Sequence, residues 1–265
     1  MSLTNKTIAN TYKDLLEVDN SNNGITTTTK TIKSGDGTSS CVSISDDQIA
    51  IRPQNDNTTN TLNVKNASGT NLLEVDSTNT IVKTLGQYAN TNIQSFGMGS
   101  VNSNPSTDNW TMLGKDMGGH RFNSVPITMG SGGTPATTYD VSSGNVASNL
   151  VQSIWYVPFN ITIDSILVFQ GSDAASGDDC DYSVMSYDID TSNGSTGGDL
   201  SNGTEVAVSP STLDPHGYDR VQYQSLTISS ANINTGKCII AYVKMGGTNS
   251  DLTVNMQLVY HLRSA

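Results

Sequence analysis

Residues 15–19 read Leu-Leu-Glu-Val-Asp, and residues 72–76 repeat the same five letters. Each copy is followed by a run of Ser, Thr and Asn and then by a β-branched residue. Each copy is preceded by an apolar residue and an asparagine, within residues 8–10 and 64–66. Apolar, polar and turn residues in this order predict a strand–turn–strand unit that the chain uses twice. Because so short a unit buries little by itself, it predicts stacking on its own copies or on other chains.

The residues between the two copies continue the strand-and-turn pattern. A threonine-rich run at 26–33 leads to a Ser-Gly-Asp-Gly segment, in which Asp36 between two glycines predicts a hairpin turn. Residues 41–45 and 48–52 alternate apolar and polar side chains, as half-buried strands do. The sequence therefore predicts that residues 1–83 form a β-repeat region for trimerisation and attachment.

Residues 84–150 differ from the repeat region, because glycine and asparagine dominate and apolar periodicity is poor. Short strands are expected only at 110–113 and 125–129. A long loop without regular structure is unusual inside a compact domain. This span is therefore predicted to be a connector between two domains.

Residues 151–265 are predicted to form a separate all-β domain, since short apolar runs recur there between clusters of turn residues. The expected strands are 154–157, 161–169, 182–189, 205–208, 221–228, 238–245 and 252–262. Strands of this number and length favour a β-sandwich of the jelly-roll kind. The expected fold class is all-β, with an N-terminal strand-repeat attachment region followed by a C-terminal β-sandwich, in a trimer.

The chain is acidic, with 24 Asp and Glu residues, 13 Lys and Arg residues and a net charge of −11. This balance opposes binding to phosphate backbones and anionic membrane surfaces, so neither nucleic acid nor membrane is an expected partner. Divalent cations fit the charge better. Asp178, Asp179 and Asp181 share one loop and predict either a calcium site or a solvated acidic loop. No other cofactor is expected.

Three cysteines, Cys41, Cys180 and Cys238, are scattered and lack metal-binding spacing. They predict reduced and mostly buried thiols, with a Cys180–Cys238 bridge as the alternative. The N-terminus has no apolar segment of the kind that directs secretion, and no stretch reaches the length of a transmembrane span.

The chain is not expected to be an enzyme, because no group of residues predicts catalysis. His120, His216 and His261 stand outside every metal-binding or nucleophile motif, and His261 is expected to be a packing or surface residue of a strand. The aromatic residues of the C-terminal half predict either core and subunit contacts or a sugar-binding surface. They are Trp155, Tyr156, Tyr182, Tyr187, Tyr218, Tyr223, Tyr242 and Tyr260.

The N-terminal third resembles virion structural proteins of tailed marine bacteriophages. The resemblance lies in residues 8–20, 26–39 and 62–76, and it covers about residues 5–83. Residues 64–76 read Val-Lys-Asn-Ala-Ser-Gly-Thr-Asn-Leu-Leu-Glu-Val-Asp, which is similar to the repeats that open phage fibre and capsid-decoration proteins. Such proteins are usually homotrimers, with intertwined N-terminal strands on the virion and a C-terminal β-domain facing solvent.

The resemblance implies a homotrimeric capsid decoration protein or head fibre, made in the host cytoplasm and displayed on the virion surface. The expected partners are copies of the same chain and a phage capsid or tail protein. A tail fibre or receptor-binding protein that recognises host-surface glycan is the alternative. The attachment residues expected from the repeat are Leu15, Leu16, Val18, Leu72, Leu73 and Val75.

Overall fold

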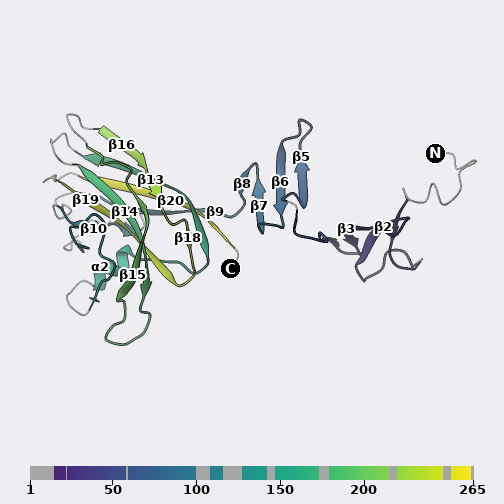
Figure 1. The fold of residues 1–265 in the computed structure, drawn as a ribbon, viewed down its shortest axis with the longest axis horizontal. Coiled ribbons are helices and arrows are strands. Elements are labelled where there is room, and N and C mark those ends of the chain that lie inside the picture. Colours follow the sequence, from purple (N-terminus) through teal and green to yellow (C-terminus); the bar gives the residue numbers. More distant parts are fainter. Residues whose placement is uncertain are drawn as a thin grey trace, which may run out of the picture. The chain divides into compact units, whose positions relative to one another are not determined.

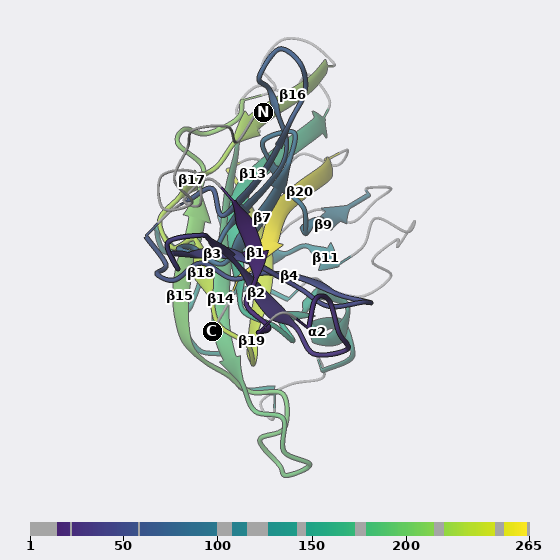
Figure 2. The same cartoon turned by 90° about the vertical axis from the view of Figure 1, so that its right-hand side faces the viewer.

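The computed structural model describes residues 15–21, 23–57, 59–99, 108–115, 127–141, 147–172, 179–214, 220–246 and 252–263 (Figure 1 and Figure 2). Contacts divide the chain into two compact units, with the boundary between Ala89 and Asn90. The strands pair antiparallel in four sheets, which confirms the predicted all-β fold class. Among the described residues α2 (Ala147–Ser153) is the one α-helix. No helix in the described part of the chain is long and apolar enough to cross a membrane.

The first sheet of the N-terminal unit, the β2 sheet, is a four-stranded meander in chain order. Its strands are β1 (Leu16–Val18), β2 (Lys30–Ser34), β3 (Ser39–Ile44) and β4 (Ile49–Ile51). The β2–β3 turn is closed by Asp36, whose carboxylate accepts hydrogen bonds from the Ser34 hydroxyl and, at 3.3 Å, from the Thr38 amide. Gly37 has a φ of 84°, in the left-handed region that glycine tolerates best. The predicted hairpin turn at Asp36 is confirmed.

The second sheet of this unit, the β6 sheet, is a second four-stranded meander. Its strands are β5 (Leu62–Lys65), β6 (Asn71–Asp76), β7 (Ile81–Thr84) and β8 (Gln87–Tyr88). The two Leu-Leu-Glu-Val-Asp copies thus contribute strands β1 and β6. Among the described strands β6 has partners on both sides, whereas β1 has only β2. The repeat therefore determines that the segment is a strand, but not whether the strand lies at the edge or in the interior of its sheet.

The C-terminal unit contains two larger sheets. In the β19 sheet the strands are ordered β10 (Trp110–Met112), β19 (Lys237–Met245), β14 (Cys180–Ile189), β15 (Leu200–Val208) and β17 (Thr227–Ile228), with β12 (Trp155–Tyr156) also on β19. In the β20 sheet they are ordered β11 (Gly114–Lys115), β9 (Thr91–Met98), β20 (Thr253–Leu262), β13 (Ile161–Ser172) and β16 (Arg220–Ser225), with β18 (Asn232–Ile233) also on β13.

The main core of the C-terminal unit takes buried apolar side chains from both sheets, which confirms the predicted sandwich. Phe96, Val168 and Met256 come from the β20 sheet, and Tyr182 and Val243 come from the β19 sheet. Facing side chains from two sheets are the usual core of a sandwich. A second cluster, which includes Trp110, Met129, Leu150 and Tyr242, joins strands of the β19 sheet to residues 127–141 and α2. Strand β19 is therefore buried on both faces, which explains its unbroken apolar run at 238–243.

The predicted connector and both predicted domain boundaries need correction. Residues 84–89 lie in the N-terminal unit, while β9, β10, β11 and α2 belong to the C-terminal unit. Strand β9 pairs with β20 from Thr91 to Met98 and buries Phe96 completely. Its apolar pattern is weak because Asn92 and Gln94 share the inward face with Phe96, while the apolar Ile93 points outward. The sandwich thus begins near residue 90 and not at 151.

Cys180 and Cys238 are buried and are not joined by a disulfide, so the alternative of a bridge between them is wrong. Cys180 lies opposite Met245 and Cys238 lies opposite Tyr187, near opposite ends of the β14–β19 pair. Seven residues along a strand separate positions by about 23 Å. A disulfide needs Cα atoms within about 7 Å. Cys41 is free and exposed.

Candidate functional site

The β2 sheet gathers its apolar side chains on one face. Val18 lies opposite Ile32, and Ile44 lies opposite Ile49. Side chains two positions apart on a strand share a face, so Leu16 belongs to the face of Val18. Lys30, opposite Ile44, and Ser34, opposite Leu16, share this face. Its apolar members are Leu16, Val18, Ile32, Val42, Ile44, Ile49 and Ile51. This surface is called the β2 apolar face.

The β6 sheet has the same division. Val75 lies between Leu62 on β5 and Val82 on β7, and Leu73 lies between Val64 and Thr84. The surface formed by Leu62, Val64, Leu73, Val75 and Val82 is called the β6 apolar face. Equivalent residues of the two repeats, Leu16 with Leu73 and Val18 with Val75, therefore occupy equivalent positions on the two faces.

Neither face is covered by the described part of the chain. Leu16 is 75% exposed and Ile49 is 73% exposed, while Val64 and Val82 are 44% and 41% exposed. Among the described residues of the N-terminal unit, none of the apolar side chains is buried. A small sheet gains independent stability only when an apolar face is packed against something. The two faces are thus composed like a protein contact surface, but no described residue packs against them.

The opposite sides of the two sheets are polar. Glu17 lies opposite Lys33, and the Lys33 ammonium is 2.7 Å from the Asp19 carboxylate. Glu74 lies opposite Lys83, whose ammonium is 5.4 Å from the Tyr88 ring centre. Exposed charge pairs of this kind add little stability, but they favour contact of this side of each sheet with water. Each sheet therefore has one side suited to water and one suited to another protein surface.

The six predicted attachment residues divide between these sides. Four of them lie on the apolar faces, as the strand pairings show: Leu16, Val18, Leu73 and Val75. Leu72 points to the polar side of β6 and is 40% exposed, and Leu15 precedes β1 and is 56% exposed. The prediction did not name the other apolar residues of the two faces, which are Ile32, Val42, Ile44, Ile49 and Ile51 on the first sheet and Leu62, Val64 and Val82 on the second. The period-two alternation at residues 41–45 and 48–52 already carried the signal for those on β3 and β4.

Asp76, which ends the second repeat, is the one buried residue in the described N-terminal unit. Its carboxylate accepts hydrogen bonds from the Asn79 amide at 2.9 Å and from the Asn79 side chain at 2.7 Å. These bonds, the side-chain bond above all, hold the pKa of Asp76 below its ordinary value. Asp76 fixes the β6–β7 turn and so sets the register of the β6 apolar face.

The predicted calcium loop is only partly described. Asp178 lies outside the described residues, and the described residues bring no three His, Cys, Asp or Glu side chains together as a metal site. Asp181 lies opposite Lys244 in the β14–β19 pair. The calcium site stays a prediction.

Two further aspartates of the same region serve the fold. Asp188 binds the Lys237 ammonium at 2.6 Å and the Asn202 amide at 2.8 Å, and these contacts, that of Lys237 first, lower its pKa. Asp190 accepts hydrogen bonds from the Ser192 amide and from the Thr196 hydroxyl, at 2.8 Å and 2.6 Å. Their carboxylates therefore hold turns and strand ends.

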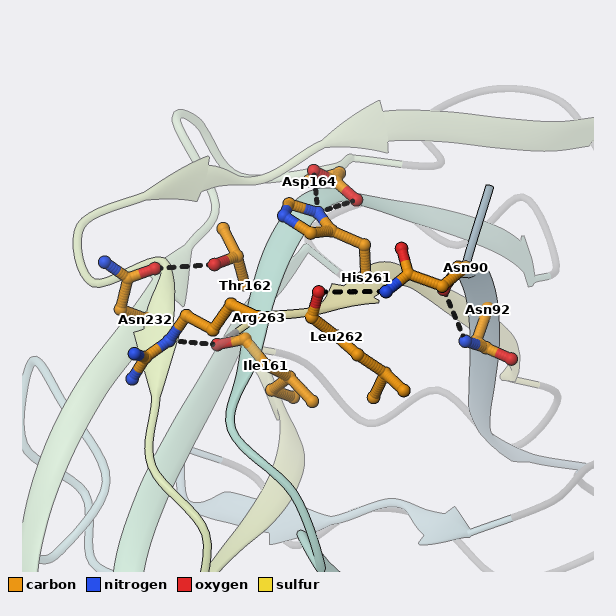
Figure 3. Close-up of polar contacts among 9 residues, drawn as sticks. All are labelled: Asn90, Asn92, Ile161, Thr162, Asp164, Asn232, His261, Leu262 and Arg263. Atoms are coloured by element: carbon orange, nitrogen blue, oxygen red, sulfur yellow. Dashed lines mark hydrogen bonds and ion pairs between the residues drawn. The ribbon is translucent and has the colours of Figure 1, made fainter. Parts of the chain in front are cut away.

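His261 packs at the end of β20, as expected for a strand histidine (Figure 3). Its Nδ1 atom is 2.9 Å and 3.0 Å from the two carboxylate oxygens of Asp164, and the residue is 6% exposed. Close by, the Asn90 side chain donates to the Leu262 carbonyl at 3.0 Å. These contacts tie the first residue of the C-terminal unit to its last strand.

The aromatic residues of the C-terminal unit divide between the core and the surface, and a sugar-binding surface stays a prediction. Trp155, Tyr182, Tyr187 and Tyr242 are buried core residues, and burial raises the pKa of Tyr182, Tyr187 and Tyr242. Tyr260 is half-buried, and Tyr156 and Tyr223 are exposed. Tyr218 lies outside the described residues. Tyr223, 73% exposed, is the most open of these aromatic rings.

Comparisons with known proteins add no family. No protein-family model and no curated protein matches the sequence. Solved structures of viruses show weak likeness over 66% of this chain: a chain from an empty head of turnip yellow mosaic virus, at 6% identity with 80% of that chain covered and a TM-score of 0.24, and chains from two strains of infectious bursal disease virus, Gx and Gt. For the latter two the identities are 11% and 13%, the TM-scores 0.23 and 0.20, and the shares of those chains covered 54% and 58%. Likeness at these TM-scores establishes neither a shared fold nor a shared function.

Proposed function

We propose that this chain is a structural protein of a bacteriophage virion, a homotrimer that decorates the capsid as a head fibre. In this role the N-terminal unit joins neighbouring chains and the particle, and the C-terminal sandwich faces solvent. The single observation that carries the proposal is the pair of uncovered apolar faces on the repeat sheets. The resemblance of the repeat to phage fibre and decoration proteins supplies the setting.

The physical support for self-association is the exposure of apolar side chains in the N-terminal unit. Complete burial of one Leu, Ile or Val side chain contributes about 1.5–3 kcal/mol relative to exposure. The described N-terminal sheets leave Leu16 and Ile49 largely in water and Val64 and Val82 partly so, which leaves burial still to be gained. Small sheets of this kind reach stability by association, and closed symmetric oligomers are the common outcome.

The support for a structural role and not a catalytic one is the use made of polar side chains. Among the described residues, Asp36, Asp76 and Asp190 close turns, and Asp164 holds His261. The β2 apolar face and the β6 apolar face are suited to packing against another protein surface.

A binding experiment with virus particles tests this role. Particles that lack the protein are mixed with the full chain or with residues 90–265 and then pelleted. We expect the full chain to pellet with the particles and the fragment to stay in solution, because the fragment lacks both apolar faces. Equal pelleting of the fragment would place attachment in the sandwich and overturn the proposed division of roles. Failure of the full chain to pellet would overturn the virion assignment itself.

A further inference from the structure

The two sheets of the C-terminal sandwich differ in how their outer sides are covered. The outer side of the β19 sheet is packed beneath residues 127–141 and α2, with Trp110, Met129 and Leu150 all at most 2% exposed. The Met129 amide donates to the Trp110 carbonyl at 2.7 Å and fixes this cover to β10. The described part of the chain offers no comparable layer over the outer side of the β20 sheet.

The uncovered side of the β20 sheet carries apolar side chains among polar ones in consecutive rows. After the register shift that follows Ile163, Val168, Val254, Met256 and other even-numbered residues point into the core, so the alternating odd positions point outward. Ile93 lies opposite Val259, and Phe169 lies opposite Tyr223. The surface formed by Ile93, Leu167, Phe169, Val221, Tyr223 and Val259 is called the β20 outer face.

The most exposed members of this face are large. Val221 is 72% exposed, Tyr223 is 73% exposed and Ile93 is 62% exposed. The rings of Phe169 and Tyr223 are 6.4 Å apart between centroids and inclined by 39°, so they form one aromatic surface. Exposed clusters of this kind on a folded domain mark interaction sites, and aromatic residues are common anchors in them.

In the part of the sheet that the structure describes, the β20 outer face has no charged side chain between its apolar ones, although the chain carries a net charge of −11. The side chains between the apolar ones are amides and hydroxyls, such as Asn255, Gln257 and Ser225. The carboxylate described at one end of the sheet belongs to Asp164, which lies against His261. Two copies of an acidic chain repel each other through most of their surface, so close contact between them requires a neutral face.

We infer that the β20 outer face is the contact between C-terminal units of neighbouring copies, with Tyr223 and Val221 as its anchors. This inference rests on the proposed homotrimer and names the surface through which its sandwiches meet. A second copy is the occupant because the face has the composition of an interface core, with aromatic residues present and charged ones depleted. The neutral surface removes the repulsion that the acidic composition would otherwise impose on self-contact.

Hydroxyl-radical footprinting of the full chain tests this contact, with a matched pair of valines as probes. Val221 on the face and Val151 on α2 are both 72% exposed within one chain, so an uncovered face labels them equally. We expect Val221 to be labelled several-fold less than Val151 in the assembled protein. The Val221→Asp and Val151→Asp variants give the energetic test, in which the protein concentration at which the assembly dissociates is measured. Val221→Asp should dissociate at a higher protein concentration than wild type, and Val151→Asp should not.

The outcomes separate this contact from the trimer itself. A trimer by mass in which Val221 and Val151 are labelled equally would overturn the contact and leave the proposed trimer intact. A monomer by mass would overturn the trimer and the contact together. Protection of Val221 that requires an added saccharide or another protein would show a different occupant and also overturn the inference.

Discussion

Val75 and Val82 lie directly opposite each other in the β6–β7 pair, on the apolar face of the second N-terminal sheet. The repeat counterpart of Val75 is Val18, which lies opposite Ile32 in the same manner on the first sheet. Cross-strand pairs of β-branched residues favour the pleated sheet itself. They also leave a flat apolar surface, and in both sheets nothing in the described chain covers it. The same chemical arrangement is therefore presented twice along one chain.

Leu72 and Leu73 allow a test of that surface with neighbouring residues. Leu73→Asp places a charge on the β6 apolar face, whereas Leu72→Asp places the same charge on the polar side of the same strand. We expect Leu73→Asp to reduce the molar mass measured by light scattering after size exclusion, since a buried charge without a partner is strongly unfavourable. Leu72→Asp should keep the wild-type mass. Equal masses for the two variants would show that the β6 apolar face makes no contact.

The corrected boundary predicts which fragments fold. Residues 90–265 should give a sheet-type circular dichroism spectrum and a cooperative melt. Residues 151–265 should not, because they lack β9 and leave the places of Phe96 and Met98 empty in the core. Each missing large apolar side chain costs about 2–5 kcal/mol. A cooperative melt of the shorter fragment at the same temperature would contradict the role assigned to β9.

Asp76 predicts a local dependence of stability on pH. Its pKa is lower in the folded chain than its ordinary value of 3.8, so the ionised form stabilises the turn. This contribution is complete above the ordinary pKa and is lost as the pH falls through the lowered one. The protection of a peptide covering residues 77–84, measured from its exchange rate relative to that of the unstructured peptide at the same pH, should therefore fall in acid. Asp76→Asn should exchange faster than wild type at neutral pH and lose the acid response of this turn. An unchanged acid response in that variant would assign it to another group.

The cysteines predict selective alkylation. Cys41 is exposed, while Cys180 and Cys238 are buried, and burial raises the pKa of the Cys238 thiol to about 12. Iodoacetamide should modify Cys41 alone in the native protein and all three residues after denaturation, because thiolate is the reactive form. A Cys41→Ser chain should take up no label while folded. Labelling of Cys238 in that folded chain would show that the β14–β19 pair opens.

Much of the C-terminal fold could be predicted from the sequence because its strands are long and bounded by turn residues. The runs at 161–169, 182–189 and 238–245 correspond to β13, β14 and β19. Strand β9 escaped prediction because polar Asn92 and Gln94 occupy inward positions and apolar Ile93 points outward. Its inward apolar residues, Phe96 and Met98, become recognisable only through pairing with β20. Pairing over such a sequence distance leaves no local signal.

The candidate surfaces were predictable in part. The repeat identified Leu16, Val18, Leu73 and Val75, because side-chain direction in a strand follows from position. Ile32 escapes a simple alternation rule because its same-face neighbours on β2, Lys30 and Ser34, are polar. Tyr182 and Tyr223 have similar local sequences of strand type, yet one is buried and the other is 73% exposed. Which side of a sheet receives a second layer depends on the whole topology, and so it could not be read from either segment.

The central claim is that other copies of the chain cover the apolar faces of the N-terminal sheets. Native mass spectrometry of the full-length protein over a dilution series that passes through micromolar concentration tests it most directly. The account predicts a species with three times the 28.0 kDa mass of one chain, which persists on dilution and is weakened by Leu73→Asp but not by Leu72→Asp. A stable monomer at micromolar concentration would contradict it.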